Sequence, residues 1–368
     1  MKKKLGVLTV LLCATPMVYA QADGNATFES SDVAMTLNGA VKGKVIASGS
    51  CGKNVNYELY DDYTLRIFGK GAMYNYKYDF GNMTVSTAPW GTKIKSVVIE
   101  DGVTRIGALA FFRCSSLTDV SIPNSVVSIG SGAFRACDAL KKVKIPNSVT
   151  SIGTLAFTDC TSLVEVNIPD GIVTIENSVF EGCSSLAHID IPNSVTSIEY
   201  DAFDGCTSLT EVIIPDAVTS IEGWAFSNCD KLKYVKIGKG VTVIDVGIFF
   251  SSDGNRKIDV EITAETPVKL LDFKVYYITA TNNAFGYPPE NVTIHVPEAI
   301  LDDYRKSEEW SYYKEQFSGY SSTGISSVGN GQSAKKVDAV YDLQGRRVTE
   351  MLSNRIYIVN GKKVINKH

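Results

Sequence analysis

The sequence repeats itself at a fixed spacing of 23 residues, and this period constrains the fold more than any other feature. The copies run over 98–120, 121–143, 144–166, 167–189, 190–212 and 213–235, with a degraded seventh copy at 236–258. A short fixed period is typical of a solenoid, in which each repeat forms one coil and contacts only its neighbours. The flanking segments must then cap, export or tether that stack.

Each copy carries the same pattern of apolar residues and turn residues. Leu209, Val212 and Ile214 predict a short strand that crosses the repeat boundary, with alternating side chains turned inward. Pro215 ends that strand, because proline cannot donate to a sheet ladder. The pair Ala202-Phe203 is predicted to fill the interior of the coil. The chain is therefore expected to be mostly β, with short helical or 3-10 turns between the strands.

The segments beside the repeats are predicted to cap them. In the lead-in at 21–97, apolar residues alternate within 49–73 in a way that predicts a β-hairpin cap. After the last repeat we expect an α/β cap over 259–317, with a helical run at 298–317. The Ser- and Gly-rich stretch 318–334 is predicted to be a flexible linker.

The two ends of the chain carry different signals. Residues 1–20 have a basic start, an apolar middle and a small-residue cleavage site, which together indicate an export signal. Residues 335–368 are predicted to form a small β unit. Within it, Asn360-Gly361 favours a two-residue hairpin, and a second hairpin is predicted at 340–348. No apolar run approaches the ~20 residues that a transmembrane helix needs.

The repeat unit and the tail each resemble a known family. Ile191-Pro-Asn-Ser-Val-Thr-Ser-Ile198, followed by Ala202-Phe203 and Cys206-Thr-Ser-Leu209, resembles the BspA-like leucine-rich repeat of bacterial surface proteins. Val340-Tyr-Asp-Leu-Gln-Gly-Arg-Arg347 with Ile356-Tyr-Ile-Val-Asn-Gly-Lys-Lys363 resembles the C-terminal sorting domain of the Bacteroidetes type IX secretion pathway. The first resemblance implies a right-handed leucine-rich-repeat solenoid over 98–258, surface display, and adhesion without catalysis.

The strand positions on either side of each inner residue vary between copies, whereas the core positions do not. One column is Asp119, Lys142, Glu165, His188, Glu211 and Tyr234, and the other is Ser121, Lys144, Asn167, Asp190, Ile213 and Lys236. These two columns are the predicted ligand-binding surface. Their mixed charge suits an extracellular protein partner, and one aromatic side chain is little for stacking on a glycan or a nucleic acid. His188 and its acidic neighbours could hold a metal, but we favour a solvated column.

A second candidate site lies before the first repeat, at Tyr74, Tyr76, Tyr78 and Phe80. In an extended segment these four rings would share one face, because side chains alternate along a strand. Two interpretations follow. The rings pack against the hairpin or the first coil, or they form an exposed loop that offers tyrosine anchors to a ligand.

Other residue patterns argue against catalysis and against a cofactor. The cysteines at the repeat spacing, Cys114 to Cys229, are predicted to be free buried thiols, because identical positions in stacked coils point the same way. Paired Cys or His ligands for a metal and the common nucleophile motifs are missing from the sequence. The net charge of -4 gives no reason to expect nucleic acid. We therefore expect an exported cell-surface or secreted binding protein without cofactors, and as the alternative a surface glycan-binding accessory protein.

Overall fold

The computed structural model describes part of the chain. The described residues are 43–78, 86–245, 247–251, 253, 255–271, 284–285, 289–320, 340–341, 356–359 and 362–365. They fall into two compact units, one within 33–337 and the other comprising 1–32 and 338–368. The predicted export signal, the start of the lead-in, Phe80 and residues 321–334 of the predicted linker lie outside the described residues.

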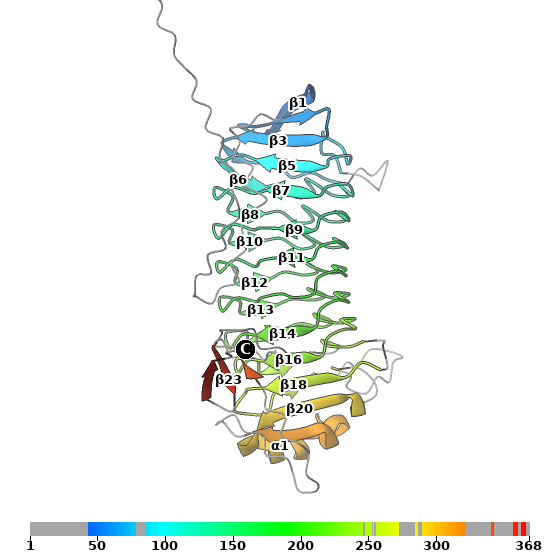
Figure 1. The fold of residues 1–368 in the computed structure, drawn as a ribbon, viewed down its shortest axis with the longest axis vertical. Coiled ribbons are helices and arrows are strands. Elements are labelled where there is room, and N and C mark those ends of the chain that lie inside the picture. The colour runs from blue at the N-terminus through cyan, green and yellow to red at the C-terminus, as the bar shows by residue number, and fades with distance from the viewer. Residues whose placement is uncertain are drawn as a thin grey trace, which may run out of the picture. The chain divides into compact units, whose positions relative to one another are not determined.

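Each 23-residue copy forms one coil of a β-solenoid, and the coils stack along the unit (Figure 1). The strands that cross the repeat boundaries make the front face of the stack. They are β5 (Ser96–Ile99), β7 (Asp119–Ser121), β9 (Lys142–Val143), β11 (Glu165–Val166), β14 (Glu211–Ile214) and β16 (Tyr234–Ile237). Neighbours such as β9 and β11 pair in parallel with a register of one repeat, as the sequence predicts.

A second set of short strands forms a return face that the sequence analysis did not predict as a sheet. These strands are β6 (Val103–Ile106), β8 (Ser128–Ile129), β10 (Ser151–Ile152), β12 (Thr174–Ile175), β13 (Ser197–Ile198), β15 (Ser220–Ile221) and β17 (Val243–Ile244). They too pair in parallel, for example β6 with β8. Most have only two residues, which is too short for alternation to identify a strand.

The interior contains one phenylalanine ladder that runs through the coils. Its members are Phe111, Phe134, Phe157, Phe180, Phe203, Phe226, Phe249 and Phe285, all fully buried or nearly so. Consecutive rings are stacked with centroids 5.0 to 5.7 Å apart. Because every coil places its ring in the same direction, each stacked pair adds to the apolar burial that holds neighbouring coils together.

A ladder of free thiols lies beside the rings, as the sequence predicts. From Cys137 to Cys229, each Sγ donates to the carbonyl of a phenylalanine one coil earlier, as Cys160 does to Phe134 at 3.2 Å and Cys183 to Phe157 at 3.3 Å. Burial raises the pKa of the Cys160 thiol to about 12. These thiols therefore remain protonated and tie adjacent coils together.

The solenoid continues past residue 258, where the sequence analysis placed the start of the cap. Strand β18 (Ile258–Ile262) extends the front face, and β19 (Lys269–Leu270) extends the return face. Phe285 stacks on Phe249 with the planes only 5° apart. The predicted boundary is wrong because this coil is longer than 23 residues, so its Ala284-Phe285 pair falls outside the period.

At the N-terminal end, an antiparallel meander covers the first coils. It comprises β1 (Val45–Gly52), β2 (Val55–Tyr60) and β3 (Thr64–Gly69), and β3 then pairs in parallel with β5. The short β4 (Gly71–Ala72) begins the return face by pairing with β6. Coil-like pairing therefore starts before residue 98, within the predicted cap.

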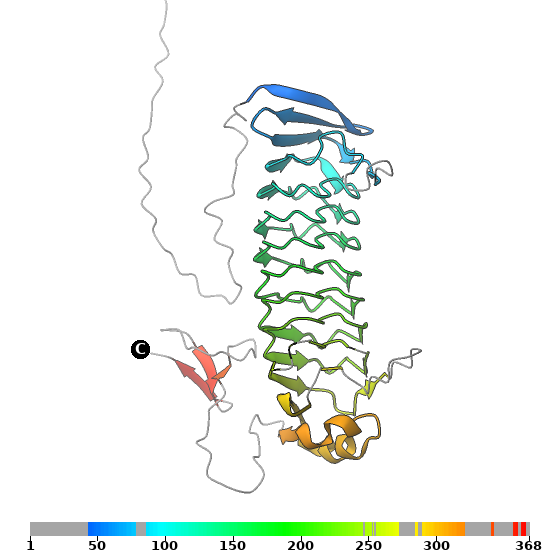
Figure 2. The same ribbon diagram turned by 90° about the vertical axis from the view of Figure 1, so that its right-hand side faces the viewer.

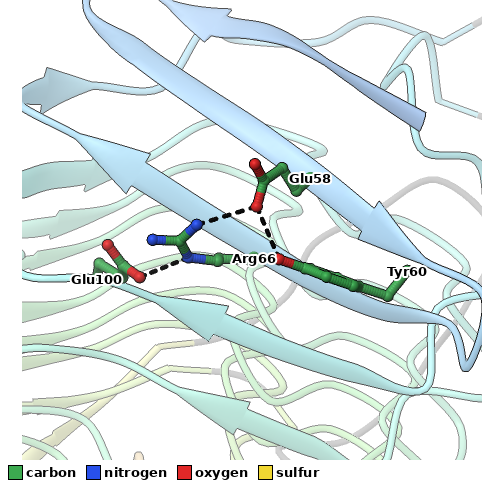
Figure 3. Close-up of polar contacts among 4 residues, drawn as sticks. All are labelled: Glu58, Tyr60, Arg66 and Glu100. Atoms are coloured by element: carbon green, nitrogen blue, oxygen red, sulfur yellow. Dashed lines mark hydrogen bonds and ion pairs between the residues drawn. The ribbon is translucent and has the colours of Figure 1, made fainter. Parts of the chain in front are cut away.

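A polar cluster ties the meander to the first coil (Figure 3). The Arg66 guanidinium lies between two carboxylates, 2.9 Å from Glu58 and 2.6 Å from Glu100. The Tyr60 hydroxyl also donates to Glu58, at 2.7 Å. These hydrogen bonds from Tyr60 and Arg66 lower the pKa of Glu58, so its carboxylate stays charged and bound.

At the C-terminal end, helical segments and two strands follow the last coil (Figure 2). They are η1 (Pro289–Asn291), β20 (Val292–Pro297), η2 (Glu298–Ile300), α1 (Leu301–Lys306), η3 (Ser311–Gln316) and β21 (Phe317–Tyr320). The predicted helical run is thus three short helices. The linker begins later than predicted, because residues 318–320 pair with β20 in the sheet.

The tail unit is a small antiparallel sheet. Its strands are β22 (Val340–Tyr341), β23 (Ile356–Val359) and β24 (Lys362–Ile365). Strands β23 and β24 pair across 360–361, which confirms the predicted two-residue hairpin. Strand β22 also pairs with β23, whereas residues 342–348 of the second predicted hairpin lie outside the described residues.

Candidate functional site

The front face presents the two predicted columns of side chains. The parallel register places Glu165 beside Lys142, and Tyr234 beside Glu211. Lys142 Nζ lies 2.8 Å from Glu165 Oε2; the Lys142 side chain is exposed and that of Glu165 is partly exposed. An exposed ion pair of this kind adds little to stability, so the pair remains available to a partner.

His188 lies in an acidic setting in the middle of the front face. Its Nε2 lies 3.1 Å from Asp190 Oδ1, and its Nδ1 lies 3.9 Å from Glu211 Oε1. Within the described ranges, no group of three or more His, Cys, Asp or Glu side chains is arranged to hold a metal ion. The His188 ring thus has a carboxylate on each side at a half-exposed position of the front face.

Asn167 differs from the other candidates because it bonds to the backbone of the preceding coil. Its amide group accepts from the N–H of Ile145 and donates to the carbonyl of the same residue, both at 2.8 Å. This pair of bonds replaces a rung of the sheet ladder. Asn167 thus has a clear structural role.

The columns extend onto strands that sequence analysis assigned to the cap. Glu261 accepts from the Tyr234 hydroxyl at 2.7 Å and lies 3.0 Å from Lys236 Nζ. His295 Nε2 lies 3.0 Å from Asp259 Oδ1. The sequence around Val260 and Ile294 alternates as a strand does, but its register with the repeats cannot be found without the 23-residue period.

A row of three side chains at this end has the composition of a nucleophilic triad. Ser318 Oγ lies 2.6 Å from His295 Nδ1, whose ring bridges to Asp259. A serine nucleophile also needs N–H donors turned toward the substrate oxygen. Strands β18, β20 and β21 direct their N–H groups within the plane of the sheet, not toward the face that carries these side chains. The row therefore ties three strands together.

Apolar side chains are exposed in the middle of the front face. Val164 is 46% exposed, Ala187 is exposed in the next coil, and Ile213 is partly exposed. Charged side chains surround them. Lys142 and Lys144, which are both exposed, lie on one side, and Glu211 and Lys236 lie on the other. An apolar centre inside a charged rim is the pattern of a protein–protein interface.

The tyrosines before the first coil do not share one face, so that expectation was wrong. Tyr76 packs edge-on against Trp90, with ring centroids 5.3 Å apart, and Tyr78 packs against Phe112. Tyr74 is 51% exposed. The segment lies along the first coil, where the Asn75 side chain accepts from the N–H of Ala108 at 3.0 Å.

The described segments contain no helix long and apolar enough to cross a bilayer. The front face, the exposed Tyr74 and the C-terminal polar row all lie on a scaffold whose core pattern repeats from coil to coil.

Comparison with known proteins identifies the repeat. A model of the BspA type Leucine rich repeat region matches residues 88–207 and 127–256. A leucine rich cell surface protein of Faecalibacterium prausnitzii is 26% identical over 60% of this chain and 71% of that chain, with a TM-score of 0.43. A leucine-rich repeat protein of T. pallidum is 28% identical over 60% of this chain and 85% of that chain, with a TM-score of 0.39.

A leucine-rich repeat protein of Bacteroides ovatus is 20% identical over 71% of this chain and 80% of that chain, with a TM-score of 0.38. No curated protein matches the sequence. The family match and the stacked 23-residue coils together show that the repeats of this chain are BspA-type leucine-rich repeats.

Proposed function

We propose that this chain is an exported surface protein that binds another protein through the front face of its solenoid, in adhesion. The observation that carries the proposal is the division of each coil into a constant core and variable exposed strand positions. Positions that vary beside a constant core are those where a repeat protein adapts to its ligand. The leucine-rich-repeat solenoid is typically a binding scaffold, and we propose no catalytic role and no cofactor.

The chemistry of the front face favours a protein over a glycan. Val164 and Ile213 supply apolar contact area, and the surrounding carboxylates and lysines supply charges of both signs. The one aromatic in the predicted columns, Tyr234, has its hydroxyl bound to Glu261. A partner with an apolar centre and mixed charge at its edge would match this surface. Nucleic acid would need a basic surface, which these columns do not offer.

Two further parts of the proposal rest on sequence alone. Residues 1–20 would direct export, and 335–368 would act as a sorting or anchoring tail. The tail would then be either cleaved off or retained as an anchor. Labelling of intact cells with an antibody against 98–258, compared with the culture medium, distinguishes a displayed protein from a released one.

The binding proposal is tested by an array of host and bacterial surface proteins and of glycans, probed with the fragment 21–334. The variant Val164→Glu places a charge in the apolar centre and should weaken binding of any protein hit at least about tenfold, or about 1.4 kcal/mol. Val127→Glu is the matched control, because Val127 is 48% exposed on the return face. Both variants should melt at the wild-type temperature.

Equal binding by both variants would contradict a role for the front face. Hits confined to glycans would support the alternative, a surface glycan-binding accessory protein. Loss of binding in Tyr74→Ser alone would move the site to the N-terminal segment, where Tyr74 is exposed.

A further inference from the structure

The return face is held together by the same three hydrogen bonds at three of the six junctions between the repeat copies. From the coil 190–212 to the one before it, these are Ser194 Oγ to Ile172 O at 2.7 Å, Thr196 N to Val173 O at 2.8 Å and Glu199 N to Ile175 O at 2.9 Å. The corresponding bonds from 144–166 to its predecessor are Ser148 Oγ to Val126 O at 2.7 Å, Thr150 N to Val127 O at 3.0 Å and Gly153 N to Ile129 O at 2.9 Å.

The junction between coils 144–166 and 167–189 lacks all three bonds among the described residues. Gly171 stands where the coils 121–143, 144–166 and 190–212 have a serine, so the hydroxyl donor is missing. The N–H groups of Val173 and Glu176 do not reach the carbonyls of Thr150 and Ile152. Strands β10 and β12 accordingly belong to separate sheets. We call this junction the seam.

A small cavity lies at the seam, between the two unpaired strands. It is lined by Ile152, Ile172, Ile175 and Glu176, with other residues of the same two coils. Interiors of proteins are close-packed, and a void removes the contacts that would hold its walls together. The coils are therefore separated here by loss of both hydrogen bonds and packing.

The far wall of the same junction remains closed. Phe157 N donates to Val179 O at 2.9 Å, and Leu155 and Asp159 make the equivalent bonds to the next coil. The stacked rings of Phe157 and Phe180 are 5.7 Å apart, the widest spacing between neighbours of the phenylalanine ladder. One wall that is bonded and one that is not give the junction the geometry of a hinge.

The seam also divides the front face. Strand β11 pairs only with β9, and β14 begins a separate sheet. The structure assigns no strand to 187–189, the front segment between them. The front face thus has a break at the seam, between Glu165 and His188, in addition to the break between β7 and β9.

The loss of a hydroxyl alone does not explain the seam. Ala217 also lacks a hydroxyl, yet Thr219 and Glu222 in its coil keep their bonds to the preceding coil, at 2.9 and 2.8 Å. Gly240 occupies the same position one coil later, and there β15 and β17 again belong to separate sheets. Glycine therefore occupies this position at both breaks in the return face, although Gly102 occupies it in the coil 98–120, where β6 still pairs with β4.

We propose that the seam is a built-in hinge, at which the return face opens and closes about the bonded phenylalanine wall. Opening changes the angle between the two halves of the front face. A partner that contacts both halves would select one angle, as in hinge motions of other proteins. The hinge would exist whichever ligand the front face binds, so it can be tested independently of the proposed function.

The test uses the reciprocal variants Gly171→Ser and Ser194→Gly in the full chain. A Cβ at Gly171 would lie 3.3 Å from Val149 O, so a serine hydroxyl there can donate to that carbonyl after a small shift. Amide hydrogen exchange should be up to about tenfold faster at 173 and 176 than at the equivalent positions 196 and 199, since one net hydrogen bond contributes up to about tenfold. Gly171→Ser should slow it by a similar factor.

A second readout follows the angle between the two halves. Spin labels at Thr118→Cys and Lys233→Cys lie on exposed front positions on either side of the seam. Five strand spacings separate them, or about 24 Å. The distance distribution should be broad in the wild type, narrower with Gly171→Ser and broader with Ser194→Gly.

Equal exchange at 173 and 196 in the wild type would overturn the hinge, as would distance distributions of the same width in all three proteins. Unchanged exchange in a folded Gly171→Ser would show that glycine is not the cause. Should Gly171→Ser fail to fold, Ser194→Gly carries the test, because it must create a fast-exchanging site at 196 and 199.

Discussion

At the residue scale, the stacking of coils places identical cysteine side chains in one column. A single buried cysteine is a small apolar residue, but Cys137 to Cys229 form a ladder in which each thiol donates to a carbonyl of the coil before. Desolvation raises the pKa of each of these thiols far above its usual range. The column therefore stabilises the fold only while it is protonated.

This coupling predicts a loss of stability in alkaline solution. Below pH 9 the thiols are protonated in the folded and the unfolded chain, so their contribution is complete. As the pH rises, the unfolded chain ionises near 9.0, whereas Cys160 in the fold ionises only at about 12. The free energy of unfolding should fall across this window, by about 1.4 kcal/mol per pH unit for each such thiol. Urea titrations at pH 8, 9 and 10 measure it.

Cys160→Ala is the control for that titration, because it removes one thiol from the middle of the ladder. It should lower stability at pH 8 but flatten the dependence above pH 9. An unaltered slope would show that tyrosines and lysines, not thiols, account for the alkaline loss.

Backbone conformation repeats as strictly as side-chain position. The residue before each ladder cysteine adopts a positive φ, which is 70° at Gly182 and Gly205 and 56° at Ala136. An L-residue with a side chain pays about 1–2 kcal/mol in the left-handed region, whereas glycine has no such strain. A residue with a side chain at this position therefore destabilises its coil, whereas a glycine does not.

Ala136→Gly should raise the free energy of unfolding by about 0.5–1 kcal/mol, the strain relieved less the added freedom of the unfolded chain. Gly205→Ala should lower it by a similar amount. A Cβ at Gly205 would make only ordinary contacts, 3.6 Å from Gly182, so the second variant measures strain without a clash. Urea denaturation measures both changes in the free energy of unfolding. Two changes of the same sign would contradict backbone strain at this position.

At the element scale, the segment 73–78 departs from the structure that its alternating aromatic residues predict. Aromatic residues at every second position favour one shared face, but the segment pairs by single bridges at Met73 and Tyr78 and has no strand between them. Tyr76 packs against Trp90, whereas the Tyr74 ring is exposed. The two interpretations left open by the sequence therefore apply to different rings.

Tyr76 supports a prediction that separates packing from hydrogen bonding. Its hydroxyl is buried and has no hydrogen-bond partner among the described residues. Tyr76→Phe should therefore raise the free energy of unfolding by about 1 kcal/mol, because an unpaired buried polar group is removed. Tyr76→Ser should lower it by about 2 kcal/mol through lost apolar burial. Tyr74→Ser, at an exposed ring, is the control and should melt as the wild type does.

Part of the arrangement of strands and coils could be predicted from the sequence. The period, the front strands and the inward Leu, Val, Phe and Cys positions follow from apolar repetition, because stacked coils bury identical positions. The return strands and the coil that ends at Phe285 did not follow, since two-residue strands carry no alternation and an insertion breaks the period. The polar neighbours Asp259 and His295 depend on that missed register.

At the scale of the whole molecule, the two ends of the ladder are sealed in the same way. Trp90 stacks on Phe111 with its indole N–H donating to Ala110 O at 2.9 Å. Trp310 stacks on Phe285 and donates to Val268 O at 2.8 Å. A tryptophan ends a stack of phenylalanines well, because its larger ring covers the last face and its N–H satisfies a buried carbonyl.

The position of a ring along the stack should determine how its loss spreads. In a solenoid each coil contacts only its neighbours, so stability is a sum over coils and junctions. Phe180→Ala weakens two junctions in the middle, whereas Trp310→Ala weakens the last coil alone. Each variant should lose about 3–5 kcal/mol of local packing.

Trp310→Ala should therefore increase amide exchange within 258–317 while the main thermal transition moves little. Phe180→Ala should lower the main transition and increase exchange in the coils on both sides of it. The variant Trp90→Ala is the matched control at the other end, and its effect should be confined to 45–111. Equal loss of protection along the whole solenoid in all three variants would mean that the stack unfolds as one indivisible unit, so that the seam at Gly171 does not divide it.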